Sequence, residues 1–193
     1  MCESCGCESD AHDHPPHAGT GHAHDHAPAA ERRSVTVGQS VLARNDRIAE
    51  QNRGIFKAHR LAVINLLSAP GSGKTSILER TAAELGKRLR MAVIVGDLQT
   101  DNDAQRIRRT GIPAVQISTG TACHLDAHMV QHALDDLEMH ALDLLFIENV
   151  GNLVCPATFD LGEGARTVVT AVTEGEDKPL KYPLVFRDAA WCW

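Results

Sequence analysis

One glycine-rich segment constrains the fold of this chain more than any other feature. Residues 63–67 are apolar, residues 68–75 read Ser-Ala-Pro-Gly-Ser-Gly-Lys-Thr, and a helical pattern follows at residues 76–85. In a strand–loop–helix unit of this kind, backbone N–H groups and the positive end of the helix dipole hold phosphate groups. We therefore predict a nucleotide site, and a chance glycine-rich turn is the less favoured alternative.

The residues of this loop have expected roles. Lys74 would place its charge against the β- and γ-phosphates, and the hydroxyl of Thr75 would bind Mg²⁺. One position departs from the usual GxxxxGK[ST] pattern, because Ser68 stands in place of its first glycine. The predicted nucleotide-binding residues are Gly71, Ser72, Gly73, Lys74, Thr75 and Ser76.

Acidic residues follow two further apolar stretches. Asp97 comes soon after residues 91–95, and Glu148 comes directly after residues 144–147. Carboxylates at the carboxyl ends of strands, beside a phosphate loop, can hold Mg²⁺ directly or through water. We predict Thr75, Asp97 and Glu148 as Mg²⁺ ligands and Lys74, Asp97, Asp103 and Glu148 as catalytic residues.

Two aspartates in the loop after Asp97 leave alternatives open. Asp101 and Asp103 precede a helical pattern that starts at residue 104. Either one would orient the attacking water or contact Mg²⁺, or it would cap the helix. Capping is the favoured reading for Asp101, and the two readings are equal for Asp103.

Strand-like and helix-like segments alternate after Leu61. This alternation predicts an α/β fold of the P-loop NTPase type, in which a mainly parallel sheet has helices on both faces. Right-handed crossovers then bring the carboxyl ends of the strands to one edge, where ligands bind. The predicted strands are residues 63–67, 91–95, 114–117, 144–147 and 167–172, and the predicted helices are residues 75–85, 104–109 and 124–137.

Three segments are expected along the chain. Residues 1–33 lack apolar periodicity and predict a disordered arm, rich in Cys and His, that binds metal. Residues 34–60 form an N-terminal strand or helix that packs on the next domain, with a helix at residues 39–59. Residues 61–193 form the P-loop domain.

The arm begins with a cysteine cluster. Cys2, Cys5 and Cys7 form a Cys-x-x-Cys-x-Cys pattern, and six histidines follow between His12 and His26. Thiolates this close chelate a soft or borderline metal ion, and the histidines would hold further ions weakly. The alternative is a scavenging or oxidation-prone tail.

A second metal set lies inside the domain. Cys123 and His124 follow the third predicted strand and Cys155 follows the fourth, so all three would meet at one sheet edge. Two thiolates and an imidazole suit Zn²⁺ or Ni²⁺, although spacing alone favours buried free cysteines. His128 is a weaker prediction as an auxiliary ligand, and His132 is weaker still. Their alternative is a solvated stripe on a helix.

Composition excludes several classes of protein. Nineteen basic and 25 acidic residues give a net charge of −6, which provides no broad footprint for nucleic acid. No run of about 18 apolar residues predicts a membrane helix, and the acidic N-terminus is unlike a signal peptide. We expect a cytoplasmic protein whose six cysteines are thiols or metal ligands rather than disulfides.

These motifs together resemble a known family. They are CxxCGC at residues 2–7, SAPGSGKT at 68–75, GDLQTDND from Gly96, CHLDAHM from Cys123, ENVGNLVCPATFDLGE from Glu148 and VTEGEDKPLKYP from Val172. The chain is similar to the hydrogenase nickel-incorporation GTPases, the HypB family of SIMIBI-class P-loop GTPases. The resemblance reaches to about Ala189, and this family tolerates serine at the position of Ser68.

The resemblance implies a function. GTP would be hydrolysed to GDP with Mg²⁺, driving delivery of Ni²⁺ to the large subunit of [NiFe]-hydrogenase. The family also implies a homodimer and a zinc-containing partner chaperone of the HypA type. It assigns Ni²⁺ to Cys2, Cys5 and Cys7, and a second Ni²⁺ or Zn²⁺ site to Cys123, His124 and Cys155.

The C-terminus departs from the family. The family continues into another strand and an Asn-Lys-x-Asp motif that reads guanine, whereas this chain ends in Ala-Trp-Cys-Trp at residues 190–193. Both of its tryptophans lie in the last three residues. We expect a product shortened by a frameshift or premature stop, with closing strands missing and a sheet edge prone to aggregation.

Three rival functions stay open. The first is a nickel or zinc storage protein with a non-functional nucleotide domain, and the second is a small-molecule P-loop kinase. The third is a urease-type accessory GTPase, whose metal motif is Cys-Pro-His. Here Ala157 follows Cys155 and Pro156, which favours the hydrogenase reading.

Overall fold

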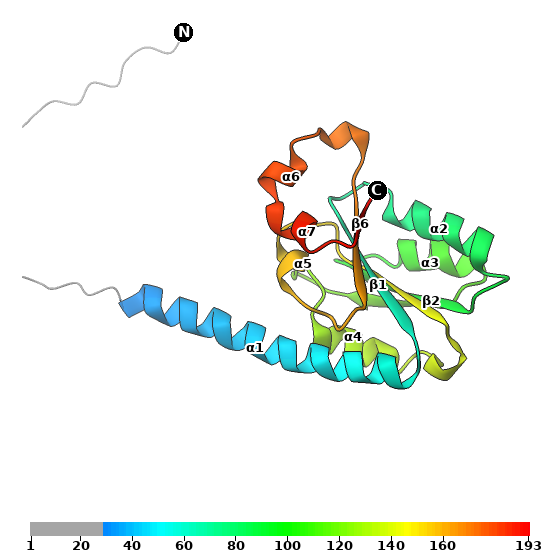
Figure 1. Ribbon diagram of the computed structural model, residues 1–193, viewed down its shortest axis with the longest axis horizontal. Coiled ribbons are helices and arrows are strands. Elements are labelled where there is room, and N and C mark those ends of the chain that lie inside the picture. Colours follow the sequence, from blue (N-terminus) through cyan, green and yellow to red (C-terminus); the bar gives the residue numbers. More distant parts are fainter. Residues whose placement is uncertain (1–28) are drawn as a thin grey trace, which may run out of the picture.

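The computed structural model describes residues 29–193, with side chains from Gln39 onward. Six parallel strands form one sheet in the order β3-β2-β4-β1-β5-β6, and Figure 1 shows the sheet with its flanking helices. The strands are β1 (Ala62–Ser68), β2 (Met91–Asp97), β3 (Ala114–Ser118), β4 (Leu144–Glu148), β5 (Ala165–Val169) and β6 (Trp191–Cys192). The α-helices are α1 (Ala29–Ala58), α2 (Lys74–Leu85), α3 (Asn102–Arg109), α4 (Ala127–Leu134), α5 (Cys155–Thr158), α6 (Lys178–Lys181) and α7 (Pro183–Arg187), and 3-10 turns lie at η1 (Met139–Ala141) and η2 (Val172–Glu174).

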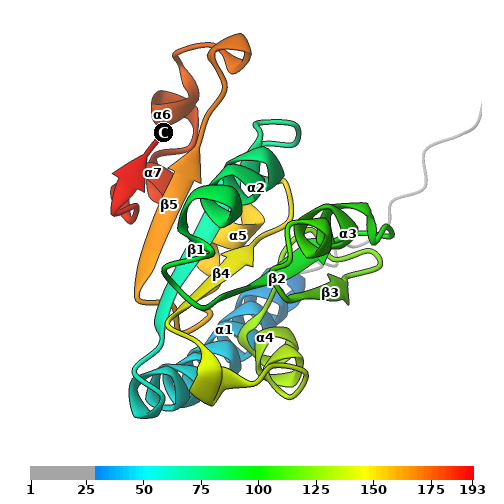
Figure 2. The same cartoon turned by 90° about the vertical axis from the view of Figure 1, so that its right-hand side faces the viewer.

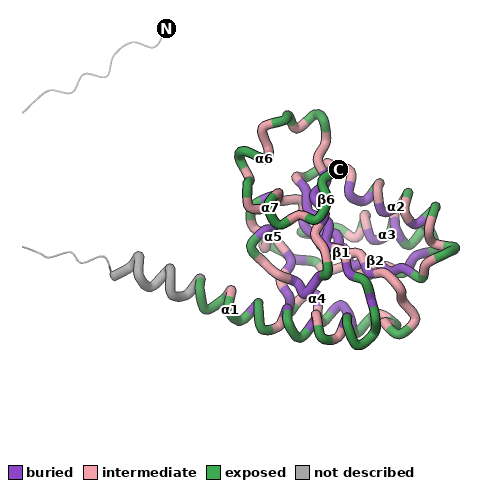
Figure 3. Tube along the Cα trace, viewed as in Figure 1, coloured by how far each residue is buried: buried purple, intermediate pink, exposed green. Residues whose placement is uncertain are grey.

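Helices cover both faces of the sheet (Figure 2). Successive strand residues point to opposite faces. Thus Ile94 of β2 packs in the core beneath α1 and α4, while its neighbours Val93 and Val95 pack in the core beneath α2 and α3. Most residues of the central strands are buried, as Figure 3 shows. Because core clusters lie on both faces, the sequences of these strands are continuous apolar runs. A third core, around Leu67, Val168 and Val185, lies under the short helices α5 and α7.

Two buried asparagines of α1 form hydrogen bonds to backbone groups at the start of α4 and in the segment before β5. Asn45 accepts a hydrogen bond from the backbone N–H of Ala127 (2.9 Å) and donates to the carbonyl of Asp160 (2.8 Å). Asn52 donates to the carbonyls of Ala127 (2.9 Å) and Leu161 (3.1 Å). These bonds fix the first residue of α4, which follows directly on the segment that carries Cys123 and His124.

The predicted elements are largely confirmed, and the differences have local causes. All five predicted strands are present, but β5 ends at Val169, because a 3-10 turn begins at Val172. Helix α4 begins at Ala127 rather than residue 124, because the Asp126 carboxylate caps it by accepting a hydrogen bond from the N–H of Met129 (2.7 Å). The predicted helix at residues 39–59 is present within α1, which begins earlier, at Ala29.

The last residues of the chain form an element that the sequence did not predict. Trp191 and Cys192 pair with β5 as the sixth strand, and the backbone N–H of Trp193 donates to Val168 (2.9 Å). In residues 29–193, β6 therefore forms one edge of the sheet, and β3 forms the other.

Some predictions lie beyond this description. Cys2, Cys5, Cys7 and the histidine run fall outside the described residues. Within the described part of the chain, no helix combines the length and apolar character needed to cross a membrane.

Candidate functional site

The phosphate loop leaves the carboxyl end of β1 and enters α2 at Lys74. Gly73 has φ +96°, a left-handed conformation that favours glycine. Gly151, in the loop after β4, lies so close to this loop that a Cβ there would be 2.9 Å from the Cα of Pro70. Glycine at both positions therefore lets the two loops close around one cavity.

This cavity has a volume of about 440 Å³, within the range of small-ligand sites. It opens at the carboxyl ends of β1, β2 and β4, as the alternating pattern predicted. It is lined by residues 70–76, Gly96, Asp97, Leu98, Asp103, Arg106 and residues 148–151.

Lys74 is buried and held by the residue that departs from the usual loop pattern. Its Nζ donates to the hydroxyl of Ser68 at 2.6 Å, and Ser68 is itself fully buried. Burial lowers the pKa of the Lys74 amine, against the attraction of Glu148, Asp103 and Glu174. The hydroxyl at position 68 thus gives the lysine a polar partner at the base of the cavity.

Thr75 and Glu148 form the predicted magnesium pair. The Thr75 hydroxyl donates to Oε1 of Glu148 at 2.7 Å, and Glu148 is only 4 % exposed. Its Oε2 is buried and has no hydrogen-bond partner within residues 29–193. Burial raises the pKa of Glu148, against the Thr75 hydrogen bond and the charge of Lys74. A hydroxyl beside a carboxylate with a free oxygen is a donor set that fits Mg²⁺.

Asp97 lines the same cavity, but its oxygens hold its own loop. Oδ1 accepts from the N–H of Leu98 (2.7 Å), and Oδ2 accepts from the N–H (3.2 Å) and the hydroxyl of Thr100. Burial opposes ionisation, yet these hydrogen bonds outweigh it and lower the pKa of Asp97. The ionised carboxylate is in place beside the phosphate loop, and its contact with Mg²⁺ stays a prediction.

The two aspartates that follow have different partners. Asp101 occupies the N-cap position of α3, as the favoured reading expected, but its side chain makes no cap hydrogen bond and pairs with Arg108 instead (2.9 Å). Asp103 lies in the first turn of α3, lines the cavity and accepts from Arg106 (3.2 Å).

Sequence reasoning missed two charged residues, one in the cavity wall and one bonded to the phosphate loop. Arg106 lines it and is fixed by Glu79 through contacts of 2.6 and 3.1 Å. Its spacing of three residues from Asp103 on one helix was the available signal. Glu174, in turn η2, accepts a hydrogen bond from the hydroxyl of Ser72 in the phosphate loop. No spacing rule indicates that contact, because 102 residues separate the two.

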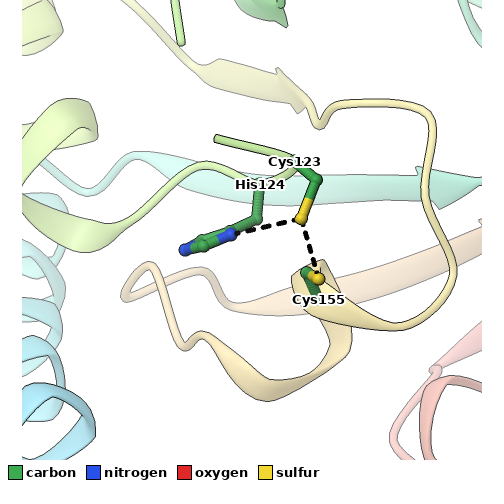
Figure 4. Close-up of side chains that lie close together, drawn as sticks. All are labelled: Cys123, His124 and Cys155. Carbon is green, nitrogen blue, oxygen red and sulfur yellow. Dashed lines mark hydrogen bonds between the residues drawn. The ribbon is translucent and has the colours of Figure 1, made fainter. Parts of the chain in front are cut away.

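The predicted inner metal set comes together. Figure 4 shows Cys123 and His124 in the loop after β3, facing Cys155 at the start of α5. The two sulfurs are 2.8 Å apart, and Cys123 Sγ is 3.9 Å from Nδ1 of His124. These ligand atoms lie within 4.8 Å of one another, and in the described part of the chain no other group of three His, Cys, Asp or Glu residues does so.

The chemistry of this trio suits a borderline metal ion. Both cysteines are free thiols, and the contact with Cys123, with burial, raises the pKa of Cys155. Burial lowers the pKa of His124, against the charge of Asp126, and so favours the neutral imidazole, whose ring stacks on Phe159 at 3.9 Å. Two thiols that can lose protons to a metal, plus a neutral imidazole, form a set suited to Zn²⁺ or Ni²⁺.

His128 does not join the trio. Its ring lies against His132 on α4, with 3.1 Å between the two Nε2 atoms. Its role as an auxiliary ligand of the inner set stays a prediction.

A buried asparagine joins the cavity to the metal set. Asn149 lines the cavity, and its Oδ1 accepts a hydrogen bond from the N–H of Leu125, the residue after His124 (3.2 Å). Its Nδ2 donates to Asn65 of β1 (3.3 Å). The backbone that carries His124 is therefore held by a side chain from the wall of the phosphate cavity.

The same network reaches the other side of the trio. Asn65 donates to Glu163 (3.1 Å), which accepts from Arg166 (2.6 Å). Arg166 in turn donates to the carbonyls of Ala157 (3.0 Å) and Phe159 (3.1 Å), in and just after the helix that begins at Cys155. The loops after β3 and β4, which lead to the three metal ligands, are therefore both joined to one buried polar network.

Comparison with known proteins supports this architecture. Residues 62–173 match the family described as the CobW/HypB/UreG nucleotide-binding domain. The hydrogenase maturation factor HypB of Azotobacter vinelandii is 59 % identical over 174 residues, covering 90 % of this chain and 57 % of that protein. The HypB of Escherichia coli K12 is 54 % identical, covering 90 % and 60 %. The chain belongs to the HypB family of hydrogenase maturation factors.

Solved HypB structures share the fold. HypB from Helicobacter pylori in complex with nickel is 44 % identical with a TM-score of 0.74, covering 77 % of this chain and 70 % of that one. HypB from Archaeoglobus fulgidus is 46 % identical with a TM-score of 0.73, covering 78 % and 73 %. The family and P-loop fold predicted from sequence are confirmed. The chain spans less than two thirds of the length of the A. vinelandii and E. coli relatives.

Proposed function

We propose that this chain is a Mg²⁺-dependent GTPase that delivers Ni²⁺ during the maturation of [NiFe]-hydrogenase. The observation that carries the proposal is the hydrogen bond from Leu125 to Asn149, which joins a cysteine–histidine metal set to a phosphate cavity. A storage protein needs the metal set alone, and a kinase needs the cavity alone. Membership of the HypB family supports the choice of hydrogenase maturation.

The cavity residues divide the work of hydrolysis. Lys74 would exchange its bond to Ser68 for contacts with the β- and γ-phosphates, and Thr75 and Glu148 would hold Mg²⁺, which would neutralise phosphate charge. Arg106, fixed by Glu79, adds a second positive charge at the cavity wall. Asp97 and Asp103 are the carboxylates left to orient the attacking water.

Nucleotide binding reaches the metal set through the loop after β4. Gly151 lies against Pro70 of the phosphate loop, and Asn149 precedes it by two residues. A shift of this loop on phosphate binding changes the hydrogen bond of Asn149 to Leu125, and so the placement of His124. Nickel affinity then differs between nucleotide states, which is the requirement for a delivery switch.

Partners follow from the family. We propose a cytoplasmic homodimer that receives metal from, or shares it with, a zinc-containing HypA-type chaperone and passes Ni²⁺ to the hydrogenase large subunit. The N-terminal Cys2, Cys5 and Cys7 form a further nickel site in this proposal. Zn²⁺ is the competing ion at Cys123, His124 and Cys155.

The test combines turnover with metal binding. The purified chain should hydrolyse GTP with Mg²⁺, in preference to ATP, and Lys74→Ala should abolish turnover while leaving nickel binding and the circular dichroism spectrum unchanged. Nickel binding without GTP turnover in the natural chain would favour the storage protein. Transfer of phosphate from GTP to a small acceptor would favour the kinase.

A further inference from the structure

The edge strand β3 presents part of its backbone to the outside of the sheet. In residues 29–193, β3 pairs with β2 on one side, and no strand lies on its other side. The backbone hydrogen bonds of Pro113 and Thr119 to β2 show that the odd-numbered residues of this stretch face β2. Alternate residues of a strand bond to opposite neighbours, so the N–H and C=O groups of Gln116 and Ser118 point away from the sheet. Such outward groups are a template for a further strand.

A groove runs along this edge between β3 and α4. Its volume is about 360 Å³, and residues 115–118 of β3 line one wall. The other wall comes from α4 and the residues after it, namely His128, Met129, His132, Ala133 and Asp136. At about 3.3 Å per strand residue and 1.5 Å per helix residue, both walls are roughly 10–12 Å long, the length of three or four extended residues. At the start of the strand, Arg108 donates to the carbonyl of Ala114 (2.9 Å), so the open edge begins at Gln116.

The groove combines an apolar floor with a negative charge at one end. Val115, Ile117 and Met129 pack on the core beneath α1 and α4 but stay partly exposed. Figure 2 shows α4 below the β2–β3 side of the sheet. Helix α4 runs back along β3, because the parallel strand β4 follows it, so Asp136 lies toward the start of β3. Apolar side chains of an added strand would cover the floor, and a Lys or Arg on the same face of that strand would reach Asp136.

We propose that this groove binds an extended segment of a partner protein, which adds to β3 as a further strand. Outward N–H and C=O groups along a sheet edge fit an extended chain, whereas a helix has already bonded its own backbone. The segment carries apolar residues and one Lys or Arg at alternate positions, which together face the groove. A second copy that paired through its own β3 would supply no such charge, because Ala114–Ser118 contains no Lys or Arg. The site needs neither nucleotide nor metal, so it does not rest on the proposed function.

Synthetic peptides test the pairing directly. The first probe is acetyl-Lys-Thr-Val-Thr-Val-Thr-amide, in which Lys and both Val share one face of a strand. The second probe has the reverse order, because an added strand can run either way along the edge. The full chain is labelled with ¹⁵N, and the backbone amide resonances of Gln116 and Ser118 are followed as peptide is added. Both resonances should shift to saturation with at least one of the probes.

Methylation of the peptide backbone separates strand addition from binding through side chains alone. In an added edge strand, the N–H groups of alternate residues face β3 and the others face solvent. One derivative of the probe is methylated at both Val nitrogens, and another is methylated at the nitrogens of the two Thr residues that precede Val. One derivative should bind about tenfold or more weakly, through loss of two hydrogen bonds, and the other should bind like the parent peptide.

Substitutions in the chain test the two walls of the groove. Gln116→Pro removes the outward N–H but leaves the bonds to β2, which use the residues on either side, so it should abolish the peptide-induced shift of Ser118. Gln116→Ala keeps the N–H and should bind normally. Asp136→Asn should weaken binding of the Lys-containing probe by about two- to fivefold, whereas Asp135→Asn, at the exposed neighbouring residue, should not. Equal binding by these two aspartate variants would remove the requirement for Lys or Arg.

Three results would overturn the proposal. The first is the absence of any shift of Gln116 and Ser118 with either probe. The second is equal binding, or equal loss of binding, by the two methylated peptides. The third is a shift of the same amides when the protein concentration is raised without peptide, which would assign the edge to a second copy. If Gln116→Pro does not fold, the methylated peptides still decide, because they are tested on the natural chain.

Discussion

The phosphate cavity and the cysteine–histidine centre lie at the same edge of the sheet, but the protein prepares them in different ways. In the cavity, backbone geometry places the loop, and each functional side chain already has a protein partner: Lys74 with Ser68, and Thr75 with Glu148. The metal centre is built by side chains from two loops, and its two cysteine thiols contact each other. The cavity must exchange internal hydrogen bonds for ligand contacts, whereas the metal centre must exchange protons for a metal.

This difference between the cavity and the metal centre predicts which substitutions cause the largest loss of function. In the proposed GTPase, a residue of the cavity would act on charge that develops during the reaction, where removing one group costs orders of magnitude in rate. A ligand of the metal centre acts on affinity alone. Substituting a residue of the hydrogen-bond network between the two sites should change neither nucleotide affinity nor metal affinity directly. It should change how strongly nucleotide binding alters metal affinity.

The largest expected effect is at Glu148. Glu148→Gln keeps an acceptor oxygen for the Thr75 hydroxyl but removes the negative charge that would bind Mg²⁺. We expect GTP turnover at saturating Mg²⁺ to fall by about 10²-fold or more, measured by phosphate release. The control is Glu84→Gln on the exposed face of α2, paired only with Arg80 at the surface. Equal turnover in both variants would remove Glu148 from the reaction.

The same variant should be more stable than the natural chain at neutral pH. Burial raises the pKa of Glu148 in the folded state, so the folded protein binds this proton more tightly than the unfolded chain. Stability from this group is complete below the unfolded pKa and is lost as pH rises through the folded pKa. The gain in melting temperature of Glu148→Gln should therefore shrink as pH falls toward the ordinary glutamate range. A gain that is constant with pH would contradict this cause.

The next largest effect is expected on metal affinity alone. Cys155→Ser removes one of three ligands at the inner centre, and its cost should exceed the roughly 10- to 100-fold loss that follows from removing an outer-shell partner. It should leave GTP affinity unchanged in the absence of metal. The matched control is Cys192→Ser, an exposed thiol on β6. Both variants are made in a chain in which Cys2, Cys5 and Cys7 are serine, so that the N-terminal nickel site does not contribute. Nickel binding followed by thiolate absorption in the ultraviolet then measures the effect, and equal absorption in both variants would place the thiolate ligands elsewhere.

Asn149 offers the sharpest test of the connection. In Asn149→Ala, the N–H of Leu125 and the amide of Asn65 lose a buried partner, which should cost about 1–3 kcal/mol of unfolding free energy. The expected functional result is loss of coupling: nickel affinity should become the same with GTP and with GDP, where the natural chain should differ by roughly 5–150-fold. The control is Asn102→Ala, an exposed residue at the start of α3. Retained coupling in Asn149→Ala would show that the two sites communicate by another route.

The two sites also differ in how well the sequence predicts them. The backbone at residue 73 has a left-handed conformation that favours glycine, and Lys74 and Thr75 follow it directly. The local sequence pattern is therefore enough to identify the phosphate cavity. The metal trio was predictable only through topology, because parallel strands bring the loops after β3 and β4 to one edge. The sequence alone favoured unconnected free cysteines there, since spacing carries no information on how two loops approach each other.

What the sequence missed depends on contacts between distant residues. Asn149 bonds a residue 24 positions away, and Ser72 bonds Glu174, 102 positions away. Asp101 was expected to cap α3, but Arg108 on the next turns of the same helix offers a full charge and takes its carboxylate. Strand β6 was missed because two residues are too short for a pattern, and only pairing with β5 makes them a strand.

The smallest expected effect concerns the residue that departs from the usual phosphate loop. Ser68→Gly restores the common glycine but removes the hydroxyl that accepts a hydrogen bond from Lys74. The nucleotide-free protein should lose about 1 kcal/mol of unfolding free energy. Nucleotide affinity should rise, by up to about fivefold if that loss is confined to the free state, because binding no longer breaks the bond between Lys74 and Ser68. Thermal unfolding and equilibrium GTP binding measure the two effects together. A variant that loses stability and also binds GTP more weakly would mean that Ser68 supports the nucleotide-bound loop as well. Binding would then not require Lys74 to exchange its bond with Ser68 for contacts with the phosphates.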